Sequence, residues 1–364
     1  MENLRIPGPT PCPNEVLQAM TKQMINHRGP EFKQILYDIT DKLKQLFQTK
    51  GDIFLLTASG TGGMEAAVVN TLSPGDKVLS VAIGVFGERF GVIAEKFGAE
   101  VIPLLFEWGK AADIDTIRKA LQDKPEIKAV LVTHNETSTG VTNDLGSISS
   151  VAKEFDKLLL VDAISSLGSI NLPVDDWRCD VTVTGSQKGW MTPPGLAMVS
   201  VSQRAWQAHS KAKMPRFYWD FTKAKNYLEK GQTPWTTGVS TVYALSTALD
   251  MVQKEGLANI IARHARVAKA ARDGIKSLGL SLFAEESHAS NTVTSVAASD
   301  GLDTKKLLKI MREEHQVVLG GGQQKLDGQI FRIGHLGRVN DDDIAAVISA
   351  LKVALPQAGF RSKS

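Results

Sequence analysis

The chain has 364 residues, of which 43% are hydrophobic and 22% charged, with a formal net charge of +3. This composition is ordinary for a globular protein, the length favours one large domain plus a smaller one, and the near-neutral charge argues against nucleic acid as a partner. No apolar run approaches the length of a membrane-spanning helix, and no signal peptide precedes the prolines. Only two cysteines are present, Cys12 and Cys179, far apart in sequence. We therefore expect a cytoplasmic protein without membrane contact, disulfide framework or bound metal.

The first two thirds of the chain alternate between short apolar runs and helical patterns. The proline-rich residues 1–15 are expected to be an extended arm, and apolar spacing predicts an amphipathic helix over residues 31–48. The runs that predict strands are 53–56, 77–81, 100–104, 129–133, 158–162, 181–184 and 196–201. Helices are expected between them at 64–72, 87–97, 115–122 and 148–155. This alternation is typical of an α/β domain with a mainly parallel sheet.

The last third of the chain has a different pattern. A helical stretch with few breaks runs from about residue 243 to residue 278. It is followed by a strand at 292–296, a helix at 304–314, a strand at 330–333 and a last helix at 341–355. This mixture predicts a small α+β domain. We therefore divide the chain into an arm (1–15), a large domain (16–255) and a small C-terminal domain (256–364).

Three features follow expected strands at the edge where parallel sheets bind ligands. They are the glycine-rich turn at residues 58–63, the acid Asp162, and Lys188 at the end of Gly185-Ser186-Gln187-Lys188. Pyridoxal phosphate requires a lysine for a Schiff base and an acid that keeps its pyridine nitrogen protonated, and small residues before a helix suit its phosphate. Each feature alone is equally compatible with a helix cap, a surface lysine or an ordinary turn. Their common placement favours the cofactor.

Four other positions carry chemistry that the pattern leaves open. Phe86 follows the next strand and is either a ring that stacks on a cofactor or a core residue. Arg332 lies within an apolar strand and needs a partner, which is either a substrate carboxylate or a structural salt bridge. His134 and Glu136 match no usual ligand spacing, so we expect no metal there. The glycines at residues 320–322 are expected to form a mobile loop near the substrate.

Together these motifs resemble the class V aminotransferases, most closely the alanine–glyoxylate, serine–glyoxylate and serine–pyruvate aminotransferases. The segments that carry the resemblance are Ser59-Gly60-Thr61-Gly62, residues 133–140, residues 161–168, residues 185–188 with Pro193-Pro194-Gly195, and Phe331-Arg332-Ile333-Gly334. The resemblance implies the α/β fold type I of pyridoxal phosphate enzymes. That fold has a large domain with a mainly parallel seven-stranded sheet and a smaller C-terminal α+β domain. It also implies transfer of the amino group of alanine or serine to a 2-oxo acid, chiefly glyoxylate.

The resemblance also assigns roles to individual residues. Lys188 would carry the Schiff base and move the substrate proton, Asp162 would pair with the pyridine nitrogen, and Arg332 would bind the substrate carboxylate. The ring would lie between Phe86 and Ile164. The remaining cofactor contacts would be made by Thr137 at the phenolic edge, by Ser59, Gly60, Thr61 and Gln187 at the phosphate, and by Thr233 and Thr236 at the phosphate of a neighbouring subunit. A homodimer is therefore implied.

Other activities remain to be weighed. A cysteine desulfurase or related lyase needs a reactive cysteine in the C-terminal part, and residues 180–364 contain none. A 2-aminoethylphosphonate transaminase stays open, because a few contacts decide which anion is bound. A non-catalytic subunit of this fold is disfavoured by the presence of both Lys188 and Asp162. A nicotinamide dehydrogenase is disfavoured because no GxGxxG follows the first strand.

Overall fold

The computed structural model describes residues 2–299 and 301–361, and its largest element is a seven-stranded sheet with the order β2-β10-β9-β8-β5-β3-β4. The strands are β2 (Asp52–Thr57), β3 (Lys77–Ala82), β4 (Glu100–Leu105), β5 (Ala129–Thr133), β8 (Leu158–Asp162), β9 (Val181–Gly185) and β10 (Leu196–Val201). Only β10 runs antiparallel to its neighbours. The predicted, mainly parallel sheet is confirmed.

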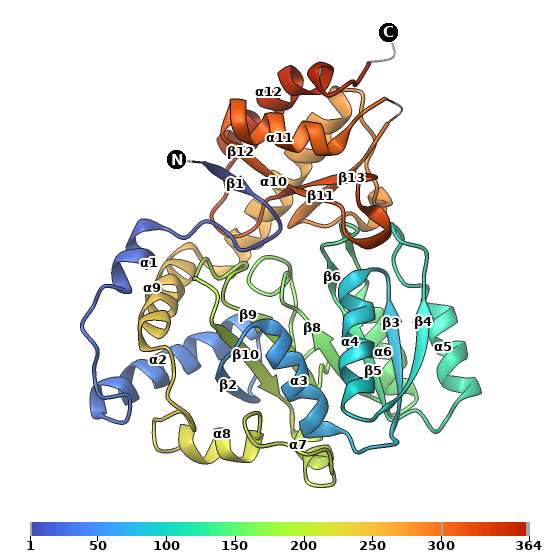
Figure 1. Ribbon diagram of the computed structural model, residues 1–364. Helices are drawn as coiled ribbons and strands as arrows, with labels where there is room; N and C mark the ends of the chain where they lie inside the picture. Colours follow the sequence, from blue (N-terminus) through green and yellow to red (C-terminus); the bar gives the residue numbers. More distant parts are fainter. Residues whose placement is uncertain (1, 300, 362–364) are drawn as a thin grey trace.

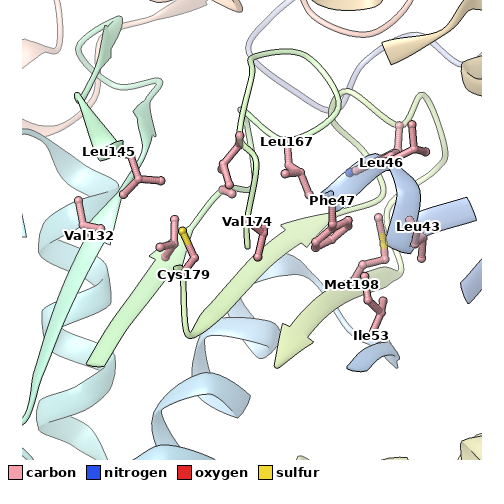
Figure 2. Packing of buried hydrophobic residues seen from close by; sticks show 14 of the residues in the cluster. Leu43, Leu46, Phe47, Ile53, Val132, Leu145, Leu167, Val174, Cys179 and Met198 are labelled. Atoms are coloured by element: carbon pink, nitrogen blue, oxygen red, sulfur yellow. The ribbon is translucent and has the colours of Figure 1, made fainter. Parts of the chain in front are cut away.

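Helices cover both faces of this sheet (Figure 1). One face carries α3 (Gly60–Thr71), α4 (Val85–Lys96), α7 (Gln203–His209) and α8 (Phe221–Leu228). The other carries α2 (Pro30–Phe47), α5 (Ile114–Asp123), α6 (Leu145–Glu154) and α9 (Val239–Glu255), with α1 (Asn14–Ala19) packed on α9. Figure 2 shows part of the second layer, with Leu43 and Phe47 of α2 close to Ile53 and Met198 of the sheet. Alternate strand residues face opposite layers, so both faces of the sheet are apolar.

A second sheet lies beyond the carboxyl ends of the parallel strands (Figure 1). Its order is β1-β12-β13-β11, formed by β1 (Asn3–Arg5), β12 (Val317–Gly321), β13 (Ile330–Gly334) and β11 (Val293–Ala297). Its apolar face packs against α10 (Leu257–Ser277), α11 (Thr304–His315) and α12 (Asp341–Gln357). The shorter elements are β6 (Asn135–Glu136), β7 (Val141–Thr142) and two 3₁₀ turns, Glu286–His288 and Gln324–Leu326. The fold is therefore α/β with an added α+β unit, as expected.

The structure corrects several expected elements. The helical stretch expected over 243–278 consists of two helices, because Gly256 adopts φ +83° and separates α9 from α10. The loop expected at 320–322 is also wrong for Gly320 and Gly321, which lie in β12. The arm begins with the extended strand β1, which pairs in parallel with β12, and its last residues belong to α1, which starts at Asn14. Two short helices, α7 and α8, were not predicted.

The proposed division into residues 1–15, 16–255 and 256–364 remains a prediction. Gly256 coincides with the proposed second boundary, whereas β1 places the first residues of the arm in the small sheet. No helix within residues 2–299 and 301–361 combines the length and apolarity that crossing a bilayer requires.

Candidate active site

A cavity of about 130 Å³ lies beyond the carboxyl ends of the parallel strands. Residues predicted from the sequence contribute nine of its lining side chains or backbone positions: Ser59, Gly60, Thr61, Phe86, Thr137, Asp162, Ile164, Gln187 and Lys188. Four others complete the lining: Met64, Arg89, Asn135 and Ser165. The fold therefore gathers segments that are up to 129 residues apart in sequence (188 minus 59) around one small space.

The first turn of α3 forms one wall of the cavity. Ser59 is the residue before the helix, and its side chain makes no capping hydrogen bond. Among the described residues, the amides of Gly60 and Thr61 have no acceptor, as expected for the first residues of a helix. A Cβ at Gly60 would overlap the end of the Ile164 side chain, so glycine lets Ile164 lie directly against the turn. Free amides at a helix N-terminus fit a phosphate group.

Gln187 adds to this wall. Its side-chain oxygen is buried and has no donor among the described residues. A buried polar atom without a partner is rare in native proteins and usually marks a position that a ligand or water completes. The Gln187 side chain is thus available to a bound group.

Asp162 is the last residue of β8 and is buried. Its carboxylate accepts hydrogen bonds from the Ile164 amide at 3.0 Å and from the Thr133 hydroxyl at 3.2 Å. Burial raises the pKa of Asp162 to about 6, and the nearby charge of Glu136 contributes to that rise. A carboxylate that is costly to ionise gains from a cationic partner, such as a protonated pyridine nitrogen.

Lys188 follows β9 in a turn that directs its side chain into the cavity. Its Nζ donates a hydrogen bond to the Pro7 carbonyl oxygen at 2.6 Å. Burial lowers the pKa of Lys188 to about 8, so about a tenth of the amine is neutral at pH 7, far more than for an ordinary lysine. A neutral buried amine can act as a nucleophile or a base.

Phe86 lies in the first turn of α4 and is half-buried. The guanidinium of Arg89 sits 4.8 Å from the centre of its ring. Ile164 lines the same cavity as Phe86. Their packing on the two faces of a cofactor ring stays a prediction.

Arg332 has no acidic partner among the described residues. It is 7% exposed, its Nε donates to the Gly321 carbonyl at 2.8 Å, and its Nη1 donates to the Thr137 carbonyl at 2.9 Å. No carboxylate in residues 2–299 or 301–361 forms an ion pair with it, and burial lowers its pKa to about 10. The alternative of a structural salt bridge is thus not supported. Arg332 does not line the cavity itself, but it binds the carbonyl of Thr137, which does, and a buried cation there fits an anionic substrate group.

Glu136 is the site residue whose role sequence reasoning missed, although it lies in the segment 133–140. Its Oε1 accepts from the Ser138 amide and hydroxyl at 3.1 and 2.6 Å. Its Oε2 accepts from the amides of Phe86 and Gly87 at 2.9 and 3.0 Å. Burial raises the pKa of Glu136, and these four hydrogen bonds oppose that shift. Glu136 therefore holds the N-terminus of α4, and with it Phe86, against the cavity.

We expect Glu136→Ala to destabilise the cofactor-free protein by about 2–4 kcal/mol, because the buried amides at the start of α4 lose their acceptor. Urea unfolding of the purified protein measures this change. Glu107→Ala is the matched control, since Glu107 is 70% exposed and, within the described part of the chain, pairs only with Lys110. The control should change stability by less than about 0.5 kcal/mol. Equal stability of the two variants would contradict the bracing role of Glu136.

Thr233 and Thr236 do not line this cavity in their own chain. Thr233 is buried, and its hydroxyl donates to the Trp235 carbonyl at 2.8 Å, whereas Thr236 is exposed. Their contact with a neighbouring subunit's phosphate stays a prediction.

His134 packs edge-on against Trp177, with ring centres 5.9 Å apart. Within the described part of the chain, no three His, Cys, Asp or Glu side chains are grouped as a metal site.

The family model "Aminotransferase class-V" matches residues 3–331. The chain belongs to the class-V aminotransferases. This class-V aminotransferase is 45% identical to the soluble hydrogenase 42 kDa subunit of Anabaena cylindrica, over 99% of this chain and 94% of that one. It is 37% identical to the serine–glyoxylate aminotransferase of Methylorubrum extorquens, over 99% and 92% of the two chains. The crystal structure of an alanine–glyoxylate aminotransferase from Nostoc sp. superposes with a TM-score of 0.94 at 31% identity, covering 97% and 95%.

Membership in this family implies pyridoxal phosphate as the cofactor. The polar groups of the cavity fit this cofactor. It offers uncommitted amides at a helix N-terminus, a buried carboxylate for the ring nitrogen, and a partly neutral buried lysine for the aldehyde. These three donor and acceptor sets match the three polar ends of the cofactor.

Proposed function

We propose that this aminotransferase moves the amino group of a small L-amino acid, alanine or serine, to glyoxylate. One observation carries the proposal: the Lys188 amine and the Asp162 carboxylate line one cavity, and the Arg332 guanidinium, which has no ion pair among the described residues, binds the carbonyl of Thr137 in that lining. The names of the relatives support glyoxylate as acceptor and alanine or serine as donor. The cofactor binds through the residues named above.

When bound, pyridoxal phosphate supplies a ring that withdraws electrons from the substrate Cα. Asp162 accepts a hydrogen bond from the protonated ring nitrogen and keeps that proton in place. Arg332 grips the substrate carboxylate and thereby sets which bond at Cα points toward Lys188. Lys188 Nζ, as a neutral amine, takes the Cα proton and holds it as an ammonium until it is returned. Lys188 can act both as the neutral amine and as the ammonium near neutral pH, because its pKa is lowered to about 8.

A half-reaction tests this proposal. Protein loaded with pyridoxal phosphate is mixed separately with L-alanine, L-serine, L-aspartate and 2-aminoethylphosphonate. Loss of the visible absorbance of the lysine-bound cofactor is followed, and the 2-oxo product is identified by mass spectrometry. We expect conversion by alanine or serine, reversed by glyoxylate. Conversion by the phosphonate alone would assign the protein to phosphonate transamination instead.

Replacement of Arg332 should weaken substrate binding. For Arg332→Gln we expect kcat/KM for the amino donor to fall on the order of 30- to 1,000-fold, or about 2–4 kcal/mol, mainly through KM, because the carboxylate loses its cation. Steady-state kinetics measure this loss. Arg338→Ala is the control, since Arg338 is 64% exposed. An unchanged KM in Arg332→Gln would remove Arg332 from the substrate site.

The geometry of the two cysteines argues against the desulfurase alternative. Cys179 is 2% exposed, and burial raises its pKa to about 12. Cys12 is partly buried, and burial raises its pKa as well. A desulfurase needs an accessible thiolate, and both thiols are protonated at neutral pH.

A second candidate comes from the name of the Anabaena relative, a hydrogenase subunit. In that case the chain would serve as a subunit and turn over no amino donor. The polar lining of the cavity and the uncommitted amides of Gly60 and Thr61 favour catalysis over a purely structural role. The half-reaction separates the two, because a subunit without activity leaves every donor unconverted.

We also propose that the enzyme is a cytoplasmic homodimer. Trp235 stacks on Phe217 and Tyr218, which are 67% and 40% exposed, and this exposed aromatic cluster adjoins Thr236. An exposed cluster of this kind is typical of a protein interface. Light scattering measures the mass in solution, and Trp235→Ala should weaken the dimer.

The proposed cytoplasmic location rests on the cysteines. The chain has two, both are free thiols, and a protein of this kind suits a reducing compartment.

A further inference from the structure

The N-terminal arm lies directly against the amine of Lys188. The Pro7 carbonyl accepts the hydrogen bond from Lys188 Nζ, and among the described residues it is the one acceptor of that amine. Three residues on, Thr10 binds the backbone around the lysine. Its amide donates to the Gln187 carbonyl and its hydroxyl to the Lys188 carbonyl, each at 3.0 Å. The arm therefore holds the lysine both by its backbone and by its amine.

Gly8, between these contacts, cannot carry a side chain unless the end of the Lys188 side chain moves away. A Cβ at this position would overlap Lys188 Nζ and lie 2.7 Å from Lys188 Cε. The residue also adopts φ +130°, a conformation that residues with side chains rarely adopt. Glycine is thus the residue that lets the arm approach the lysine closely enough for Pro7 to accept its hydrogen bond.

The same arm is anchored in the small sheet. β1 pairs with β12, and Arg5 forms an ion pair with Asp343 at 2.6 Å. In Figure 1, β1 (dark blue) lies beside β12, and the chain then descends toward the large sheet. A Cβ at Gly334 would overlap the Ile6 carbonyl, so the arm is threaded tightly past β13. The Pro7 carbonyl is consequently held in place from the small sheet.

We propose that the Pro7 carbonyl is a positioning acceptor for the free amine of Lys188, and that Gly8 is required because it alone admits this contact. The inference rests on the proposed function and adds a residue to its machinery. During turnover the amine of Lys188 is released, takes a proton from the substrate Cα and returns it. The carbonyl accepts a hydrogen bond from both the amine and the ammonium, so it keeps Nζ aimed into the cavity in both states. It stabilises the ammonium more, because hydrogen bonds to charged donors are stronger.

The test compares Gly8→Ala with Gly328→Ala. Gly328 also has a positive φ, +75°, but nothing lies within 4 Å of a Cβ placed there, so it controls for backbone strain alone. The first readout uses cofactor-free protein: an amine-reactive reagent labels Lys188 across a pH series, and peptide mass spectrometry measures the extent. We expect the labelling midpoint of Gly8→Ala to fall by about one pH unit, a tenfold change in the ratio of ammonium to amine, and that of Gly328→Ala to match the wild type.

The second readout separates kcat from KM. In Gly8→Ala we expect kcat to fall about 10- to 100-fold while KM for the amino donor stays within about threefold, because Arg332 is untouched. Thr10→Val is a second variant, needed if Gly8→Ala fails to fold. It removes the hydroxyl bond to the Lys188 carbonyl and should shift the labelling midpoint in the same direction by a smaller amount.

Wild-type labelling midpoints in both Gly8→Ala and Thr10→Val would overturn the positioning role. So would a kcat of Gly8→Ala equal to that of Gly328→Ala. The labelling experiment does not depend on transamination. If the midpoint shifts but no amino donor is converted by the wild type, the positioning role stands and the proposed function fails.

Discussion

Replacing Lys188 with alanine should abolish transamination. The variant lacks both the nucleophile for the cofactor aldehyde and the base that moves the Cα proton, so we expect turnover to fall by about 10⁴-fold or more. Borohydride reduction of the cofactor-loaded protein, followed by peptide mapping, should place the cofactor on Lys188 in the wild type and nowhere in the variant. Steady-state assays measure the loss of rate.

The control for this variant is Lys119→Ala, whose side chain is 76% exposed in the native protein. It should retain wild-type turnover and cofactor attachment. The removal of Lys188 loses one hydrogen bond but also removes an ammonium that burial disfavours, so the protein should stay folded, and thermal unfolding checks this. Repeated turnover by a folded Lys188→Ala protein would refute the assignment of the active site.

Replacing Asp162 with asparagine should lower activity but raise the stability of the cofactor-free protein. The carboxylate keeps the ring nitrogen protonated, and its loss should reduce kcat by about 100-fold or more. The same carboxylate is costly in the cofactor-free protein, because burial raises its pKa from 3.8 to about 6. Asparagine occupies the same volume without that charge and keeps an acceptor for the Ile164 amide. We therefore expect Asp162→Asn to be less active and, without cofactor, more stable.

The pH dependence of this stability gain has a definite sign. The folded state holds the Asp162 proton more tightly than the unfolded state, so wild-type stability falls as pH rises from about 4 to about 6. The gain of Asp162→Asn should be near zero below about pH 4 and reach on the order of 2–3 kcal/mol above about pH 6. Urea unfolding of both cofactor-free proteins across this range measures it. A variant that is less stable than the wild type at pH 7 would contradict the desolvation argument.

The sequence predicted the large sheet because its strands are buried on both faces. Runs such as residues 129–132 and 158–161 are continuously apolar, and β5 and β8 lie there with nearly the same bounds. It did not predict the break at Gly256, because the apolar spacing continues across it and a single glycine does not always end a helix. It also missed β12, since the glycines at 320 and 321 suggested a loop. There the strand is stabilised by its neighbours β1 and β13, not by local propensity.

The candidate site, like the fold, was predictable from the sequence only in part. Lys188, Asp162 and the turn at residues 58–63 were predictable, because chemistry at the carboxyl ends of parallel strands follows from the strand order alone. The bracing role of Glu136 was not, because its four hydrogen-bond donors come partly from a helix about 50 residues away. The sequence around Arg332 also did not show whether the residue has an acidic partner, since any partner would come from distant segments.

By itself, then, the sequence determined the α/β class, the family resemblance and the candidate residues for the chemistry, because these depend on local periodicity and on short motifs. Only the tertiary structure decided that Arg332 lies buried without an acid among the described residues, that Glu136 braces α4, and that the arm rests on Lys188 through Pro7 and Gly8. Each of these depends on contacts between segments far apart in the chain. Such contacts are set by how the two sheets pack, and no local pattern records them.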